Sequence, residues 1–178
     1  MTATAETIRI RSANASDVAD ITSIYAHAVK HGTASFEIEP PDTVEMGKRQ
    51  KILLEGGFPY LVADAGGVVA GFAYAGPYRP RFAYRYSVED SVYVHPRAQR
   101  MGVGRLLLER LIAESEQRGF RQMVAIIGDS QQTASIELHR TLGFSPVGTL
   151  HNIGFKHGRW LDSVIMQLPL GNGATELP

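Results

Sequence analysis

The sequence predicts a mixed α/β fold, and three observations lead to this prediction. Its 178 residues fit one domain without internal repeats or low-complexity tracts. Apolar residues recur with period two in seven segments and with helical spacing in four others. These segments follow the order β α α β β β α β α β β, in which helices separate many of the strands. The domain is expected to span residues 7–170, with disordered tails at 1–6 and 171–178.

The first half of the chain contains four of the predicted strands and two of the predicted helices. Asn14 or Ser16 is a suitable cap for the first helix, because both side chains can accept a backbone N–H bond. The second helix is opened by proline and closed by glycine, and a tight turn at Gly66 and Gly67 joins a strand pair. The expected elements are a strand at 7–13, helices at 14–31 and 40–57, a strand pair within 59–77 and a strand at 84–94.

The second half begins with a helix that runs to about Arg118 and alternates strands and helices thereafter. Gly143 is expected to end the last helix, since glycine adopts the left-handed conformation common after helix ends. The expected elements after the first helix are a strand at 121–128, a helix at 131–142 and strands at 145–151 and 163–170.

The helix that follows residue 102 starts in an unusual way, with Gly102 and Gly104 directly before a leucine-rich pattern. Helix N-termini carry unpaired N–H groups and a partial positive charge, and glycines let an anion approach them. Arg100 and Arg105 add charge on either side. We interpret the turn as a pyrophosphate site. The alternative is that the glycines only turn the chain and the arginines are solvated.

Composition excludes several classes of function. The chain has no cysteine, which rules out disulfides, thiolate metal sites and a cysteine nucleophile. Eighteen basic residues balance eighteen acidic ones, so no overall field favours nucleic acid or an anionic membrane. The histidines lack the spacing of metal ligands, and no metal is expected. No signal peptide or spanning segment is evident, and we expect a cytoplasmic protein.

Several stretches resemble one enzyme family. QRMGVG, residues 99–104, resembles the Q/R-x-x-G-x-G/A signature with which the GNAT superfamily of N-acetyltransferases binds the pyrophosphate of acetyl-CoA. TASIELHRTLGF, residues 133–144, resembles that superfamily's second CoA-contacting helix. PYRPR, YSVEDSVYVHPRAQRMGVG and KHGRWLD resemble its phosphinothricin and methionine sulfoximine acetyltransferase branch over about residues 7–170. The resemblance implies a GNAT fold: a mostly antiparallel sheet of six or seven strands, splayed between strands 4 and 5, with about four helices.

The resemblance also implies where acetyl-CoA, as co-substrate, is bound. Its pantetheine arm is expected to lie in the gap between the splayed strands and to pair with the fourth strand like an added strand. Gln132 stands where the family usually has asparagine, with the same amide one methylene further out. The expected coenzyme-binding residues are Val92, Tyr93, Val94, Arg100, Met101, Gly102, Val103, Gly104, Arg105 and Gln132.

Two neighbouring carboxylates are candidates for the base that removes a proton from the attacking amine. Glu89 is the leading candidate and Asp90 is its competitor. Alternation places Glu89 on one face and Asp90 on the other, among valines, whereas a β-bulge would exchange these faces. Spacing alone therefore leaves the choice open, and at least one of the two is expected to be a surface or arginine-paired carboxylate.

Arginines just upstream of these carboxylates suit an anionic or oxygen-rich substrate. Arg79, Arg81 and Arg85 can offer planar guanidinium groups to a carboxylate, phosphinate or sulfoximine group. Without the family resemblance, a solvated loop with arginines at its rim explains them as well. The expected substrate-binding residues are Arg79, Pro80, Arg81, Glu89, Asp90 and Ser91.

His139 stands where many relatives have a tyrosine that acts as an acid. An imidazole with an ordinary pKa of about 6.5 can donate a proton to the departing thiolate near neutral pH. A structural role for this histidine is the alternative. The catalytic residues expected from the sequence are Glu89 and His139.

The activity expected from all these features is transfer of acetyl from acetyl-CoA to the α-amino group of a small amino acid or analogue, by direct attack in a ternary complex. The acceptors implied are phosphinothricin, methionine sulfoximine or methionine sulfone. Alternatives are a protein or peptide N-acetyltransferase and a noncatalytic acyl-CoA-binding regulator. The resemblance also implies a homodimer, for which FAYRYSVE, residues 82–89, and Trp160 are candidate contacts.

Overall fold

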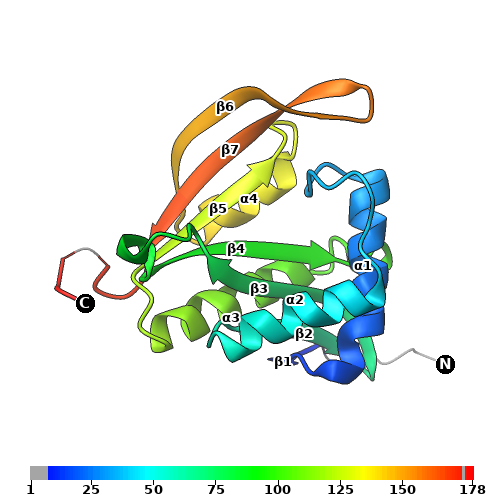
Figure 1. The fold of residues 1–178 in the computed structure, drawn as a ribbon, viewed down its shortest axis with the longest axis horizontal. Coiled ribbons are helices and arrows are strands. Elements are labelled where there is room, and N and C mark those ends of the chain that lie inside the picture. Colours follow the sequence, from blue (N-terminus) through cyan, green and yellow to red (C-terminus); the bar gives the residue numbers. More distant parts are fainter. Residues whose placement is uncertain (1–7, 174) are drawn as a thin grey trace.

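The computed structural model describes residues 8–173 and 175–178, and its centre is one seven-stranded sheet (Figure 1). The sheet order is β1-β2-β3-β4-β5-β7-β6, in which β4 and β5 are parallel and the other neighbours are antiparallel. This confirms the predicted mixed, mostly antiparallel sheet. The strands are β1 (Arg9–Ser12), β2 (Tyr60–Ala65), β3 (Val68–Pro77), β4 (Ser87–Val94), β5 (Gln122–Gly128), β6 (Ser145–Lys156) and β7 (Arg159–Pro169).

Helices cover both faces of this sheet (Figure 1). The helices are α1 (Val18–His31), α2 (Thr43–Glu55), α3 (Val103–Gln117) and α4 (Thr133–Thr141), with short 3-10 turns η1 (Ala15–Asp17), η2 (Phe82–Tyr84) and η3 (Pro96–Ala98). On the face of α1 and α2, Ile21 and Val29 pack against Tyr60 and Phe72. On the face of α3, three buried leucines pack against strand residues; they are Leu107, Leu108 and Leu111. Two separate apolar cores therefore hold the sheet between them.

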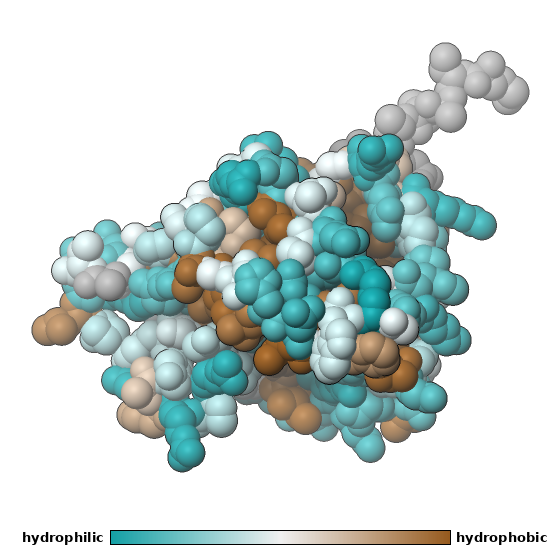
Figure 2. Space-filling view, turned by 90° about the horizontal axis from the view of Figure 1, so that it is seen from above, coloured by the Kyte–Doolittle hydropathy of each residue, from teal (hydrophilic) through white to brown (hydrophobic). Residues whose placement is uncertain are grey.

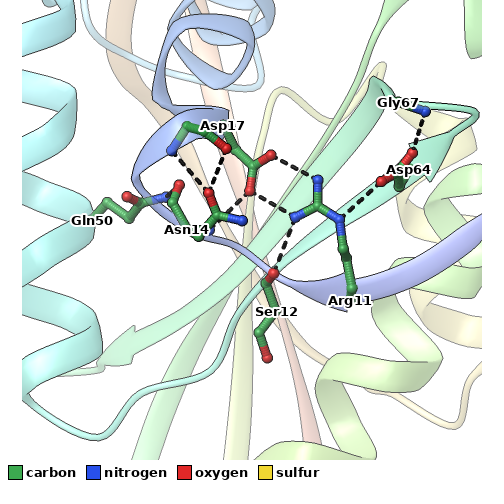
Figure 3. A network of polar contacts seen from close by, with 8 residues as sticks. Arg11, Ser12, Asn14, Asp17, Gln50, Asp64 and Gly67 are labelled. Atoms are coloured by element: carbon green, nitrogen blue, oxygen red, sulfur yellow. Dashed lines mark hydrogen bonds and ion pairs between the residues drawn. The ribbon is translucent and has the colours of Figure 1, made fainter.

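The start of the fold is fixed by a polar network around Arg11 (Figure 3). Its guanidinium donates to both carboxylate oxygens of Asp17 at 2.8 Å and to Asp64 at 2.9 Å. Asp17 also accepts the backbone N–H of Asn14, whose side chain in turn accepts from Ser16. The hydrogen bonds from Arg11 hold the pKa of Asp17 below its ordinary value. The network joins β1, η1 and the end of β2 into one unit.

Strand β4 is paired very differently along its two edges. Its pairing with β3 is continuous from Pro77 opposite Val88 to Gly71 opposite Val94, with no bulge. Its parallel pairing with β5 covers four residues and ends where Asp90 faces Ala125. Beyond that point the two strands diverge (Figure 1), as predicted for the fourth and fifth strands. The gap between them is the structural centre of the candidate site.

The β6 and β7 strands form a hairpin much longer than the two segments predicted from the sequence. It turns at His157 and Gly158, both of which have positive φ. The stretch FKHGRWLDS, residues 155–163, resembles the C-terminal hairpin of the acetyltransferase branch with a glycine turn before Trp160, and the structure has this turn. The predicted strand segments at 145–151 and 163–170 were too short, because a register shift between Leu150 and Gly154 and a positive φ at Asn152 interrupt the alternation of the sequence. The hairpin therefore extends well past the end of β5.

Strand β6 is an edge strand of the sheet, and apolar side chains are exposed along this hairpin. Apolar residues also gather on the face seen in Figure 2, which looks down on the molecule from the hairpin side. The large apolar side chains that are exposed on the hairpin are Val147, Leu150, Ile153, Phe155 and Trp160. Exposed apolar residues along an edge strand are typical of contact surfaces.

Several smaller predictions can be compared with the structure. Asn14 caps the 3-10 turn η1 that leads into α1, whereas Asp17, the N-cap of α1 itself, makes no side-chain cap bond. Asp42 caps α2, where the prediction relied on proline. Asp42 accepts the N–H of Glu45, which satisfies one of the unpaired groups at the start of the helix. No helix in the described part of the chain is long and apolar enough to cross a bilayer. The predicted tail at 1–6 lies outside the described residues, and the tail at 171–178 stays a prediction.

Candidate active site

The gap between β4 and β5 brings together residues from four parts of the chain. After the last rung at Asp90 and Ala125, the inner edges of residues 91–94 and 126–128 have no strand partner among the described residues. Helix α4 and the α1–α2 connection at Ala34 complete the wall. The residues that line this cavity include Glu89, Asp90, Ser91, Val92, Tyr93, Ile126, Gly128, Gln132 and His139. Most of the predicted site residues on β4 and α4 therefore do converge.

The glycine turn lies beyond the end of β4, immediately before α3. Gly102 caps this helix with a φ of 81°, and Arg100 also adopts a positive φ of 64°. A β-carbon at Gly104 would lie 3.4 Å from a Leu138 methyl and 3.6 Å from a Val94 methyl. The turn is thus held between β4 and α4, the two elements that border the gap. The unpaired N–H groups at the start of α3 are available to an anion here.

The two arginines of this turn differ in their surroundings. Arg105 donates to Glu109 at 2.7 Å, one helical turn further along α3. Arg100 is exposed, and no described residue pairs with its side chain. The structure therefore assigns Arg105 a structural ion pair in addition to the coenzyme role predicted for it. Because that pair is exposed, it adds little stability and can be exchanged for a phosphate contact.

Glu89 is a half-buried carboxylate on the α1/α2 face of the sheet. The absence of a bulge between β3 and β4 fixes the alternation, which settles on which face each carboxylate lies. No residue in the described ranges donates a hydrogen bond to Glu89. Burial raises its pKa above the ordinary value, the charge of Asp90 raises it further, and Arg79 opposes the shift. A carboxylate with a raised pKa and a free edge is suited to accept a proton.

Asp90 lies on the opposite face, where it is buried against a residue of α4. Its Oδ2 lies 3.0 Å from Nε2 of His139, and both side chains are almost fully buried. Its other oxygen, Oδ1, is buried and has no partner among the described residues. The aspartate that alternation places among valines is therefore hydrogen-bonded to a histidine of α4, a helix far away in the sequence. A buried carboxylate in apolar surroundings needs such a partner.

The protonation of His139 follows from its two neighbours. Nδ1 lies 2.7 Å from the carbonyl oxygen of Ser135, which can only accept, so Nδ1 carries a proton. Burial lowers the pKa of His139, but the hydrogen bond and charge of Asp90 outweigh it and raise the pKa above its ordinary value. Both ring nitrogens therefore carry protons over a wider pH range, and the imidazolium is paired with Asp90 in the wall of the gap.

The arginines upstream of β4 do not all approach the carboxylates. Arg79 is exposed, and it is the one whose charge acts on Glu89. Arg85 stacks on the rings of Phe82 and Tyr86, with its guanidinium carbon 4.4 Å from each centroid. Within the described residues the Arg81 side chain makes no hydrogen bond or ion pair, and it is exposed. The guanidinium carbon of Arg79 lies 5.2 Å from the centroid of the Tyr78 ring, and Arg79 is the one of the three whose charge acts on the pKa of Glu89.

The α1–α2 connection closes over one side of the gap. Gln132 donates to the hydroxyl of Thr33 at 3.0 Å, so the amide that was predicted to contact pantetheine also holds this connection in place. Lys156, buried in β6, donates to the carbonyl of Ser35 at 2.6 Å. Burial lowers the pKa of Lys156. The connection is therefore fastened to both α4 and the β6–β7 hairpin.

Sequence reasoning missed two parts of this site. It did not pair Asp90 with His139, although the aspartate among valines was a signal that a polar partner was needed. It also did not predict that Thr33 and Ala34 border the gap, because a connection without a motif gives no signal. Among the described residues, no cluster of three or more His, Asp or Glu side chains could hold a metal ion.

Comparison with known proteins relates this geometry to one family. The model of the acetyltransferase (GNAT) family matches residues 20–144. A phosphinothricin N-acetyltransferase of Alcaligenes faecalis is 52% identical over 169 residues, 95% of this chain and 86% of its own length. An L-methionine sulfoximine/L-methionine sulfone acetyltransferase of Salmonella typhimurium is 45% identical, with 93% and 96% covered. A phosphinothricin acetyltransferase from Sinorhizobium meliloti, solved with acetyl-CoA, superposes with a TM-score of 0.94 at 46% identity, with 97% and 93% covered.

Proposed function

Given that the chain belongs to the GNAT family of acetyl-CoA-dependent acetyltransferases, we propose that it acetylates the α-amino group of a small amino acid or analogue. The acceptors proposed are phosphinothricin, methionine sulfoximine and methionine sulfone, which are the compounds named for its relatives. The observation that carries this proposal is Glu89, a half-buried carboxylate without a hydrogen-bond donor among the described residues, at the edge of a gap suited to the coenzyme.

In the proposed reaction the amine nitrogen attacks the acetyl carbonyl directly, and the carbon–sulfur bond breaks. Glu89 accepts the proton that leaves the nitrogen, and the departing thiolate takes up a proton for which the charged His139 is the proposed source. Glu89 then releases its proton to water and His139 regains one, which completes the balance. Asp90 keeps His139 charged between turnovers.

The coenzyme is proposed to lie along the free inner edge of β4. Backbone groups of residues 92–94 would pair with the pantetheine arm, and the turn at residues 100–105 would hold the pyrophosphate. The free strand edge and the positive φ values at Arg100 and Gly102 support this placement. Gln132 lines the gap, and its side-chain oxygen accepts no hydrogen bond from a described residue. This oxygen can therefore accept a hydrogen bond from the pantetheine arm.

Arg79 is proposed to bind the carboxylate of the acceptor. Its charge reaches Glu89, so one amino acid could present its amine to the carboxylate and its own carboxylate to the guanidinium. Pro80, Arg81 and Ser91, which were also predicted to contact the substrate, flank these two residues in the chain. Ser91 lies on the same strand face as Glu89 and lines the gap.

We also propose that the protein is a cytoplasmic homodimer. The exposed apolar residues of the β6–β7 hairpin, among them Phe155 and Trp160, support self-association. Phe82, which is 80% exposed, is a second candidate contact. Light scattering at two concentrations tests the proposal: a dimer mass at both supports it, and a monomer mass at both contradicts it.

A substrate panel tests the proposed activity. Release of free thiol from acetyl-CoA is measured with phosphinothricin, methionine sulfoximine and methionine sulfone, and in parallel with a set of peptides. Turnover of the free amino acids with little on the peptides is the expected result. Turnover of peptides alone would assign the chain to protein acetylation, and coenzyme binding without turnover of any amine would make it a binding protein.

A further inference from the structure

The α1–α2 connection is packed directly against the strands on one side of the gap. A β-carbon at Gly128, the last residue of β5, would collide with the carbonyl oxygen of Thr33. A β-carbon at Gly154 of β6 would collide with the ring of Phe36. These two glycines leave the room into which the backbone and one ring of the connection fit. The position of residues 32–37 is therefore closely set by the strands beneath them.

The connection also borders the cavity in which Glu89 lies. Ala34 lines that cavity together with Glu89 and Tyr93. Its neighbours Thr33 and Ser35 are both buried, so the chain on either side of Ala34 is held within the fold. An acceptor whose amine lies at Glu89 is then next to the connection. The firmness with which the connection is held therefore bears on how firmly the acceptor is held.

Gln132 joins this connection to α4. Its backbone carbonyl accepts the N–H groups of Ser135 and Ile136 and so opens the helix, whereas its side chain makes no cap bond. The side-chain amide instead donates to the hydroxyl of Thr33, 99 positions earlier, at 3.0 Å. The same helix carries His139, the proposed acid. A single side chain therefore links the connection to the helix on the coenzyme side of the gap.

The amide of Gln132 can serve two partners at once. Its nitrogen holds Thr33, while its oxygen accepts no hydrogen bond from a described residue and belongs to a side chain that lines the gap. A hydrogen bond accepted by an amide oxygen polarises the amide and makes its N–H a stronger donor. A ligand on the oxygen also orders the side chain, so the bond to Thr33 costs less conformational entropy. Occupation of the oxygen should therefore strengthen the hold on the connection.

We infer that Gln132 is a positioning residue that makes the affinities for acetyl-CoA and for the acceptor depend on each other. The inference rests on the proposed function, in which the pantetheine arm bonds to the Gln132 oxygen and the acceptor amine lies at Glu89. Each substrate is expected to tighten the binding of the other about fivefold, the lower end of the usual range for coupled sites. The factor is the same in both directions, because the binding steps close one thermodynamic cycle.

Calorimetry with coenzyme A measures this factor without turnover, since coenzyme A carries no acetyl group. Its dissociation constant is determined with and without saturating methionine sulfone, and the ratio of the two constants is the coupling factor. A ratio of about five is expected for the wild type. A ratio of one in an enzyme that acetylates methionine sulfone overturns the inference alone. A wild type that acetylates no free amino acid overturns the proposed function itself.

Three threonine variants locate the coupling. Thr33→Val keeps the shape of the side chain and removes the hydroxyl, so the ratio should fall to about one, whereas Thr33→Ser keeps the hydroxyl and should keep the ratio. The matched control is Thr22→Val in α1, which removes a hydroxyl that donates to the carbonyl of Val18 at 2.6 Å and does not line the gap. Its ratio should equal that of the wild type. A ratio kept in Thr33→Val, or lost equally in Thr22→Val, overturns the inference.

A fourth variant tests the other end of the bond. Gln132→Asn shortens the side chain by one methylene, which moves the amide about 1.5 Å away from the Thr33 hydroxyl. The ratio should again fall to about one, even if the affinity for coenzyme A alone also changes. Loss of stability, measured by thermal unfolding, is the effect expected of a merely structural bond, and it leaves the ratio untouched. A ratio that survives Gln132→Asn overturns the role of Gln132.

Discussion

The two faces of the sheet differ most sharply at strand β4, where Glu89 and Asp90 are neighbours. Glu89 faces α1 and α2 at the edge of the gap and has no hydrogen-bond donor among the described residues. Asp90 faces α3 and α4 and is buried against His139. Two consecutive residues of one strand are therefore a carboxylate without a hydrogen-bond donor and a carboxylate that is paired. The first environment suits an exchangeable ligand, and the second suits a fixed proton.

One strand can therefore contact both substrates, the acceptor on one face and the coenzyme along its free edge. The α1/α2 face would hold the acceptor, and the gap with the α3/α4 face would hold the coenzyme and the proton for its thiolate. Variants on the first face should then alter acceptor kinetics, and variants on the second should alter coenzyme affinity or the pH profile.

The largest effect is expected from Glu89→Gln. Loss of the base should lower kcat by about a hundredfold to ten-thousandfold. Acetyl-CoA affinity by calorimetry should be unchanged, because the variant keeps the shape of the side chain. In the wild type the acidic limb of the rate profile should lie above the ordinary pKa of glutamate, since burial raises the pKa of Glu89. If the variant keeps that limb, Glu89 is not the base.

The next effect is expected from Asp90→Asn, which leaves a neutral partner for His139. The raised pKa of His139 should fall, because the hydrogen bond and charge that raise it are lost. The charged imidazole is then lost at lower pH, so the alkaline limb of kcat should move toward lower pH. Proton NMR of the imidazole and the rate profile measure the shift. A limb that stays in place would contradict the role of the pair.

A smaller effect is expected from Gly102→Ala in the turn before α3. Its φ of 81° strains any residue with a β-carbon, at a cost of about 1 kcal/mol. Gly57 has a φ of 79°, also faces open space and lies far along the chain from the site, so Gly57→Ala is a matched control. Both variants should lose similar stability in thermal unfolding, but only Gly102→Ala should weaken acetyl-CoA binding, by about fivefold. Equal affinities would exclude the turn from the coenzyme site.

Much of the fold was predictable because its signals are local. Alternation and helical spacing located all seven strands and four helices of the described chain, since each element packs one face on a core. The strands of the β6–β7 hairpin were predicted too short. Irregular pairing between Leu150 and Gly154 interrupts the alternation of apolar and polar residues on which the strand prediction depends. Its exposed strand β6 has little burial to impose a pattern on the sequence.

The candidate site was predictable in part. The glycine turn was expected from its own residues, and Glu89 and His139 were expected with the help of the family resemblance; the structure places Glu89 and His139 at the gap. The pairing of Asp90 with His139 joins residues 49 positions apart, and no local spacing encodes such a contact.

The early end of pairing between β4 and β5 makes the stability of this protein depend on the concentration of acetyl-CoA. Past Asp90 the inner backbone N–H and C=O groups of β4 have no strand partner and must bond to water. A ligand bound there would supply these hydrogen bonds. A ligand that binds the folded chain alone adds RT ln(1 + [L]/Kd), about 2.7 kcal/mol at a hundred times Kd. The melting temperature should therefore rise with coenzyme concentration, and starvation for acetyl-CoA would shorten the lifetime of the folded enzyme.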